Sequence, residues 1–378
     1  MGHWLAGFAW KVYALVWGAH APRVLFGAPR PKLARAASAT LPVGLTPKPS
    51  ARRRRQHAGA RGLPKTCGTS GLVAFAIGLA AVCAVAALTP MAWAKLDVVA
   101  TTPDLAAVAQ EIGGNLISLT TLTRPTEDPH FVDAKPSFIV KLNRADALIE
   151  GGAELELGWL PSLLEGARNP KLASGAPGRI ACAEGVELLE VPATLNRAQG
   201  DVHAMGNPHF MSDPVNAKIA ARHIAEAFCR LDSKSCDFYR ENLAKFSQRL
   251  DGKLAEWQKA LAPFQGKRVA AYHNTWPYFS KRFGLRIDLF LEPKPGIPPA
   301  PAHLAEVISK MQAEQIRVII VEPYQNRKTA ETVAADTGGV VIDLAQYPGG
   351  VRGTEGGYVQ LMDHLVHAVA SAMEPVSK

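Results

Sequence analysis

From residue 95 onward, short runs of apolar, often β-branched residues alternate with segments in which apolar residues recur every three or four positions. The runs 96–101, 116–122 and 147–150 predict strands, because each is short and bounded by turn-forming residues. The segments between and after them predict helices at 105–112, 136–143 and 155–167. Strands and helices that alternate at this spacing predict a parallel sheet with helices on both faces.

The same alternation returns in the last third of the chain. It predicts strands at 268–272, 288–291, 318–322 and 340–344, and helices at 276–283, 303–314, 330–336 and 358–373. Each half has little more than a hundred residues, which is enough for one hydrophobic core. The pattern therefore predicts two α/β lobes.

A long amphipathic segment separates the two lobes. Residues 237–262 carry apolar side chains on one stripe and charged side chains on the other, and the segment stops at Pro263. At about 1.5 Å per residue such a helix spans roughly 39 Å, enough to reach from one lobe to the other. The predicted fold class is therefore α/β, with two parallel-sheet (β/α)4 lobes joined by a long rigid helix. The predicted boundaries are 95–232 for the first lobe, 233–264 for the linking helix and 265–378 for the second lobe.

Residues 1–94 differ from the rest of the chain. They contain twelve Lys and Arg residues and no Asp or Glu, and they end in an apolar segment, 71–88, followed by Ala92-Trp93-Ala94. A basic region, an apolar region and a small-x-small site, in this order, are typical of a secretory signal peptide. Cleavage is predicted after Ala94, with export to the periplasm. A single membrane anchor is the alternative, since eighteen apolar residues lie at the lower limit for spanning a bilayer.

Removing this leader changes the charge of the protein. The whole chain has 42 Lys and Arg against 33 Asp and Glu, so residues 95–378 carry 30 against 33, a formal charge of about −3. The basic isoelectric point therefore belongs to the leader, and no nucleic-acid partner is expected. Export favours an oxidising environment, in which Cys229 and Cys236 either form a short-loop disulfide or remain ordinary thiols; Cys182 is expected to be buried.

Besides His203, three histidines of the mature chain lie outside predicted helices. His130 follows Asp128-Pro129 in the loop after the second strand, His209 follows Asn207-Pro208, and His273 follows a strand directly. In parallel sheets ligands bind at the carboxyl ends of the strands, and imidazole is a common metal ligand. The other mature histidines outside the 203–209 segment fall within predicted helices and are interpreted as surface or packing residues: His223, His303, His364 and His367.

Several short motifs follow in a fixed order behind the signal peptide and around the long helix. They are Val-Val-Ala-Thr-Thr-Pro-Asp-Leu at 98–105, Asp-Pro-His at 128–130, Asn-Pro-His at 207–209, His273, Pro-Ala-His-Leu at 301–304 and Val-Glu-Pro at 321–323. In this order and spacing, the mature chain resembles the zinc- and manganese-binding proteins of bacterial ABC importers, the ZnuA-like or TroA-like proteins. The resemblance implies a C-clamp of two lobes with a metal buried between them.

The resemblance also implies a set of ligands. His130 and His209 would be the first pair and His273 the third, and a third imidazole favours Zn²⁺ over Mn²⁺. The family supplies an aspartate as fourth ligand where this chain has Ala345 or Gln346. Glu322 is the preferred substitute, either as the fourth ligand or as a carboxylate that orients an imidazole. Asp343, His203 and a water molecule are the other candidates.

The function implied by the resemblance is capture and delivery, without chemistry on the metal. A monomer would take up a divalent metal, most often Zn²⁺ and alternatively Mn²⁺, and deliver it to the membrane permease of an ABC importer. A secreted zinc-dependent hydrolase is the alternative, because three histidines with an open fourth position also describe a catalytic site. The chain has no His-Glu-x-x-His motif and no nucleophile elbow, which favours the binding protein.

Overall fold

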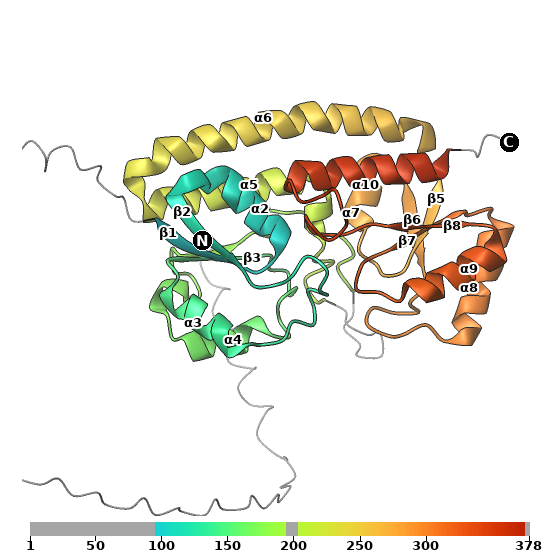
Figure 1. Cartoon of the computed structure of the whole chain (residues 1–378), viewed down its shortest axis with the longest axis horizontal. Helices are drawn as coiled ribbons and strands as arrows, with labels where there is room; N and C mark the ends of the chain where they lie inside the picture. Colours follow the sequence, from blue (N-terminus) through green and yellow to red (C-terminus); the bar gives the residue numbers. More distant parts are fainter. Residues whose placement is uncertain (1–94, 194–202, 375–378) are drawn as a thin grey trace, which may run out of the picture. The chain divides into compact units, whose positions relative to one another are not determined.

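The computed structural model describes residues 95–193 and 203–374, so the predicted leader and its cleavage site lie outside the described residues. The described elements that follow the leader form two four-stranded parallel sheets, in the orders β2-β1-β3-β4 and β6-β5-β7-β8 (Figure 1). The predicted α/β fold class is confirmed. The lobe boundaries remain a prediction.

The first sheet is formed by strands close to the predicted ones, with one short strand added. Its strands are β1 (Leu96–Ala100), β2 (Ile117–Thr121), β3 (Ala147–Glu150) and β4 (Arg179–Ala181). Its helices are α2 (Pro103–Gly113), α3 (Pro136–Arg144), α4 (Leu160–Ala167) and α5 (Pro214–Leu231). β3 is buried along its whole length, which agrees with a strand covered on both faces.

The second sheet repeats this arrangement. Its strands are β5 (Arg268–Ala271), β6 (Arg286–Phe290), β7 (Val318–Val321) and β8 (Val340–Asp343). Its helices are α7 (Pro277–Phe283), α8 (Pro301–Ala313), α9 (Arg327–Thr337) and α10 (Tyr358–Met373). β5 pairs with β6 on one side and β7 on the other, as β1 pairs with β2 and β3 in the first sheet.

The predicted linking helix is α6, which runs from Cys236 to Leu261 over 26 residues. Its buried residues are Tyr239, Phe246, Leu250, Trp257 and Leu261, members of the predicted apolar stripe. Figure 1 shows α6 extending over α5 and α10, and α6 contacts both helices as well as α2. A disulfide joins Cys229 and Cys236 at its start, and Cys182 is buried.

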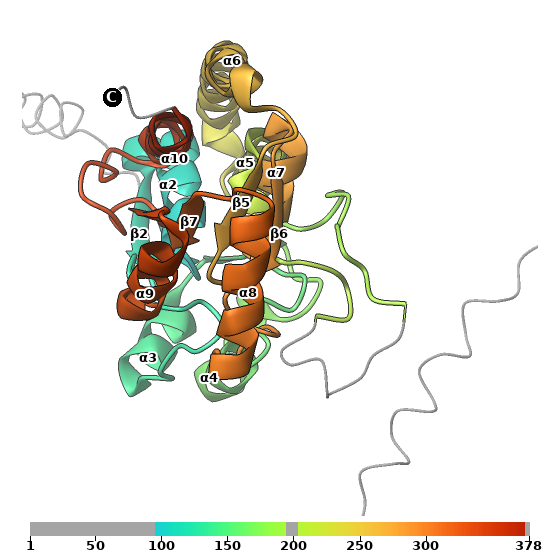
Figure 2. The same ribbon diagram turned by 90° about the vertical axis from the view of Figure 1, so that its right-hand side faces the viewer.

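One hydrophobic core extends across both sheets. It contains residues of α2, α5, α6, α7 and α10 together with one face of each sheet, for example Val98 of β1 and Val269 of β5. Separate smaller cores cover the opposite faces, with α3 and α4 on the first sheet and α8 and α9 on the second. Figure 2 shows α6 and α10 at the top and α3 and α4 at the bottom. The shared core ties the two sheets together, which agrees with the expected rigid connection.

One predicted helix begins later than its sequence suggests. The prediction placed residues 155–167 in a helix, but α4 begins at Leu160. The preceding residues turn around the carboxylate of Glu156, which accepts hydrogen bonds from the backbone N–H groups of Gly151 and Gly152 at 2.7 and 3.1 Å. These bonds satisfy polar groups that a regular helix would leave unpaired here, so they override helix propensity. Within the described ranges, no helix is sufficiently long and apolar to cross a membrane.

Candidate metal centre

The structure brings the three predicted histidines together. His130 lies in the loop after β2, His209 lies just before α5, and His273 lies two residues beyond the end of β5. One ligand atom from each side chain lies within 4.8 Å of the others. Among the described residues this is the one group of at least three His, Cys, Asp or Glu side chains that meets this distance. His209 and His273 lie 79 and 143 positions after His130 in the sequence, and the three side chains thus form one cluster.

The rings of these histidines face a common centre. The Nε2 atoms of His130 and His209 are 3.3 Å apart, and the two rings meet edge to face with centroids 5.1 Å apart. The His273 ring lies 5.9 Å from that of His130 and 5.6 Å from that of His209. Neutral imidazoles whose nitrogens converge in this way offer lone pairs to a single metal ion.

Proline and tryptophan contacts fix the loop that carries His130. The backbone N–H of His130 donates to Asp128 Oδ1 at 2.9 Å, and Trp159 Nε1 donates to the carbonyl oxygen of Pro129 at 2.9 Å. Trp159 is buried at the start of α4. The loop is therefore anchored to the core of the first lobe at Pro129 and constrained internally by Asp128.

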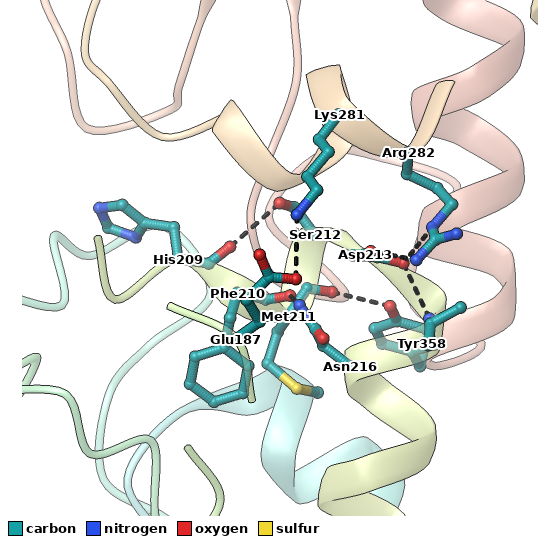
Figure 3. A network of polar contacts seen from close by, with 11 residues as sticks. Glu187, His209, Phe210, Met211, Ser212, Asp213, Asn216, Lys281, Arg282 and Tyr358 are labelled. Carbon is teal, nitrogen blue, oxygen red and sulfur yellow. Dashed lines mark hydrogen bonds and ion pairs between the residues drawn. The ribbon is translucent and has the colours of Figure 1, made fainter. Parts of the chain in front are cut away.

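The segment that carries His209 is held from both lobes. Asn207 Oδ1 accepts the backbone N–H of His209 at 3.0 Å, and Tyr278 of α7 donates its hydroxyl to the carbonyl oxygen of Asn207 at 2.6 Å. Arg282 of α7 forms two hydrogen bonds of 2.8 Å with Asp213, the N-cap of α5. Figure 3 shows the contact between Arg282 and Asp213 and the polar contacts around residues 209–216, with the His209 ring directed away from them. The ring is thus presented by a constrained backbone.

Strand register places three polar side chains side by side in the second lobe. Ala271 of β5 pairs with Phe290 of β6 and with Ile320 of β7. Two residues further along each chain come His273, Glu292 and Glu322. Glu292 Oε2 lies 2.8 Å from His273 Nδ1. The sequence analysis missed Glu292, although it directly follows a predicted strand, because the pairing of that strand with the one before His273 is a tertiary feature.

Glu322 is buried but lies outside the histidine cluster. Its exposed fraction is 1%, and neither carboxylate oxygen has a hydrogen-bond partner within normal distance. The nearby Thr275 hydroxyl and Trp276 N–H are likewise buried and unpaired. Burial raises the pKa of Glu322 from 4.5 to about 7, although Thr275 and the charge of His273 act in the opposite direction. A buried carboxylate without partners is costly unless a cation neutralises it.

Burial and neighbouring charge keep two of the imidazoles neutral. Burial, followed by the positive charges of His203 and His273, lowers the pKa of His130 to about 3. Burial and the adjacent histidines also lower the pKa of His209 well below its ordinary value. Burial acts to lower the pKa of His273 as well, but the hydrogen bond to Glu292 and nearby carboxylates outweigh it, so that pKa is raised. At neutral pH His130 and His209 are therefore ready to bind a metal.

Asp343 and His203 are not part of the cluster. Asp343 is exposed and forms an ion pair with Arg327. Gln346 lies beside His209 and donates to the hydroxyl of Tyr324 at 2.6 Å. The ring of His203 stacks on that of His130 with centroids 5.0 Å apart, yet it is not one of the three clustered side chains. The histidines within helices are also not part of the cluster. For example, His303 lies 3.1 Å from the carbonyl oxygen of Phe290.

A cavity of about 190 Å³ adjoins the histidines. His130 and His273 line it together with Asp128, Glu292 and Tyr324. Both carboxylates in the wall lie next to a histidine of the cluster. The cavity is large enough for several water molecules, whose share of liquid volume is about 30 Å³ each. It therefore offers a polar approach to the cluster.

Residues 98–372 match the family described as zinc-uptake complex component A, periplasmic. The match includes all three clustered histidines and both sheets. The chain belongs to this family. The resemblance seen in the sequence, to ZnuA-like solute-binding proteins, is thereby confirmed, and the protein is a substrate-binding protein and not an enzyme.

Individual relatives are similar over much of their length. The manganese ABC transporter substrate-binding lipoprotein PsaA of Streptococcus pneumoniae is 26% identical over 248 residues, 64% of this chain and 77% of its own. The metal ABC transporter substrate-binding lipoprotein FimA of Streptococcus parasanguinis is 27% identical over 249 residues, which are 64% of this chain and 77% of its own. Both sequence identities are at the level expected of distant homologues.

Solved structures share the fold. A crystal structure of ZnuA superposes with a TM-score of 0.63 and 24% identity, covering 74% of this chain and 99% of its own. A zinc-bound ZnuA with residues 138–173 deleted gives a TM-score of 0.64 and 23% identity, covering 75% of this chain and 100% of its own. The two-lobed metal-binding fold that the sequence predicts is therefore confirmed.

Proposed function

We propose that this protein captures a divalent transition metal, preferentially Zn²⁺, between its two sheets and delivers it to the permease of an ABC importer. The convergence of three ring nitrogens within 4.8 Å carries the proposal. The names of the relatives support import of a metal, since PsaA and FimA are substrate-binding lipoproteins of metal ABC transporters. The alternative of a zinc-dependent hydrolase has no support in the family or in these relatives.

The geometry of the first two ligands favours zinc. Two nitrogens bound to one tetrahedral Zn²⁺ at about 2.0–2.1 Å lie about 3.3–3.4 Å apart. The Nε2 atoms of His130 and His209 are already 3.3 Å apart. Three imidazoles also suit zinc better than manganese, which is held mainly by oxygen ligands. Mn²⁺ is the alternative cargo, because the relative PsaA is named as a manganese protein.

We assign the fourth position to Glu322. Its carboxylate is buried and unpaired, and it lies in register beside His273 at the carboxyl end of β7. A bound dication would supply the charge that this carboxylate lacks, at the point where ligands bind in parallel sheets. Because Glu322 lies outside the 4.8 Å cluster, its side chain has to move toward the metal on binding.

Delivery requires export and docking on a membrane protein. The predicted signal peptide supports a periplasmic protein, and the small net negative charge of residues 95–378 argues against a nucleic-acid partner. The protein is proposed to act as a monomer. Metal bound through neutral imidazoles is released when the ligands are protonated or displaced, so delivery needs no chemistry on the metal.

Competition among metals tests the proposal directly. Purified protein is equilibrated with Zn²⁺, Mn²⁺ and Cu²⁺ together, the bound metal is quantified, and the site is examined by X-ray absorption. We expect one tightly held zinc per chain with three nitrogen neighbours and one oxygen neighbour. Preference for manganese, or more than three nitrogens around zinc, would contradict the assigned ligands. Absence of a tight site for all three metals would contradict the function.

A further inference from the structure

Glu292 occupies a place in the metal centre that the ligand set does not include. It follows β6, the neighbour of β5, and the register of the two strands sets it beside His273. The backbone reinforces this pairing, because the N–H of Glu292 donates to the carbonyl oxygen of Tyr272 at 3.0 Å. The carboxylate is therefore fixed by the sheet and not by a flexible loop.

The contact between the two side chains is short and sheltered. Glu292 Oε2 lies 2.8 Å from His273 Nδ1, and the side chains are only 15% and 11% exposed. A carboxylate can only accept, so the Nδ1 atom must carry a proton and donate it. This leaves Nε2 as the nitrogen with a lone pair for a metal.

We propose that Glu292 is a positioning residue for metal binding: it holds His273 in the Nδ1–H form, with Nε2 available to the ion. The proposal deepens the proposed function and rests on it. Metal-bound histidines commonly donate their second N–H to a carboxylate, which fixes ring orientation and makes the imidazole more basic. A neutral imidazole without such a partner has no fixed tautomer, so part of the protein would present the wrong nitrogen.

His209 and His273 differ in how their rings are positioned. His209 Nδ1 is buried without a hydrogen-bond partner, and its ring is positioned through the backbone of its segment. His273, by contrast, comes directly from a strand end and has a carboxylate on its Nδ1 atom. The single negative charge of Glu292 also offsets part of the charge of a bound dication. Glu292 thus performs for His273 what loop constraints perform for His209.

Two substitutions at Glu292 separate the hydrogen bond from the charge. Glu292→Ala removes both, while Glu292→Gln keeps an acceptor oxygen for Nδ1–H and removes only the charge. Asp343→Asn is the matched control, because Asp343 is a carboxylate of the same lobe that is exposed and paired with Arg327. Circular dichroism and thermal unfolding show that each variant is folded.

The first readout needs no metal. Long-range ¹H–¹⁵N spectra of histidine-labelled, metal-free protein, recorded at a pH at which His273 is neutral, distinguish the two imidazole tautomers, and the signals lost in His273→Gln identify His273. We expect Nδ1–H in the wild-type protein, in Glu292→Gln and in Asp343→Asn, and a shift toward Nε2–H in Glu292→Ala. An unchanged tautomer in folded Glu292→Ala would overturn the proposal.

The second readout is zinc affinity, measured by competition with a chelating dye. Glu292→Ala should bind zinc about 10- to 100-fold more weakly, the range known for such carboxylates, and Glu292→Gln should lose less. Asp343→Asn should match the wild type. Wild-type affinity in folded Glu292→Ala would overturn the positioning role. If the wild-type protein binds no metal, the proposed function fails, and the tautomer measurement still decides whether Glu292 orients His273.

Discussion

Each of the two sheets has a buried glutamate beyond the carboxyl end of one strand, and the two glutamates differ in their hydrogen bonding. Glu156, beyond β3 of the first sheet, accepts from the Thr101 hydroxyl at 2.6 Å and from two backbone N–H groups. Glu322, beyond the equivalent strand β7, has no hydrogen-bond partner within normal distance for either oxygen, although the Thr275 hydroxyl and the Trp276 N–H lie nearby. Burial raises the pKa of both to about 7. The difference teaches that the chain itself satisfies one carboxylate, and it supports the proposal that the other binds a metal.

The largest effect is expected at the histidines that are proposed to bind the metal together with Glu322. We expect His209→Ala to weaken zinc binding by more than about 100-fold, because removing a ligand costs more than removing a residue that orients one. Isothermal titration with a competing chelator measures the loss. His223→Ala, a helical histidine outside the cluster, is the matched control and should retain wild-type affinity. Equal loss in both variants would show a general effect on folding.

Glu156→Ala tests the structural half of the comparison. Three donors would lose their acceptor in a buried site, so we expect a loss of about 2–4 kcal/mol in the free energy of unfolding. Urea unfolding of the metal-free protein provides the measurement. Zinc affinity of the folded variant should stay within about threefold of the wild type. A stable variant with impaired zinc binding would reverse the assigned roles.

Glu322→Gln tests whether the unpaired carboxylate binds the metal. No hydrogen bond is lost and a buried charge is removed, so the metal-free variant should be as stable as the wild type or slightly more so. Zinc affinity should fall about 10- to 100-fold, a loss of roughly 1.4–2.7 kcal/mol. Chelator competition and urea unfolding give the two values. Unchanged zinc affinity would mean that a water molecule occupies the fourth position.

The pH dependence of stability tests the raised pKa of Glu156. Burial raises the pKa of Glu156 from 4.5 to about 7, so the folded protein keeps a proton that the unfolded chain has released. This contribution is fully present below pH 4.5 and is lost as the pH rises through about 7. Stability of the metal-free protein should therefore decline over this window by up to about 3 kcal/mol more than that of Glu156→Gln. Parallel stability curves would contradict the raised pKa.

The sequence determined the elements that local chemistry controls. Apolar runs and three-to-four spacing gave both sets of strands and the long helix, because strand and helix periodicity are local properties. The prolines and asparagines around His130 and His209 marked rigid turns, and strand ends marked His273. The short strand β4 was not predicted, because three residues are too few to show a period.

Tertiary structure decided which of these side chains meet. Whether Glu292 or Glu322 approaches His273 depends on the register of three strands. The two glutamates follow His273 by 19 and 49 residues in sequence, and it is Glu292 that contacts it. Sequence alone kept Asp343 as a candidate beside the preferred Glu322 and could not show that Asp343 is exposed and paired whereas Glu322 is buried and unpaired. Periodicity follows from the backbone of each segment, but desolvation and pairing of charges depend on what packs around them, and only the folded chain specifies that.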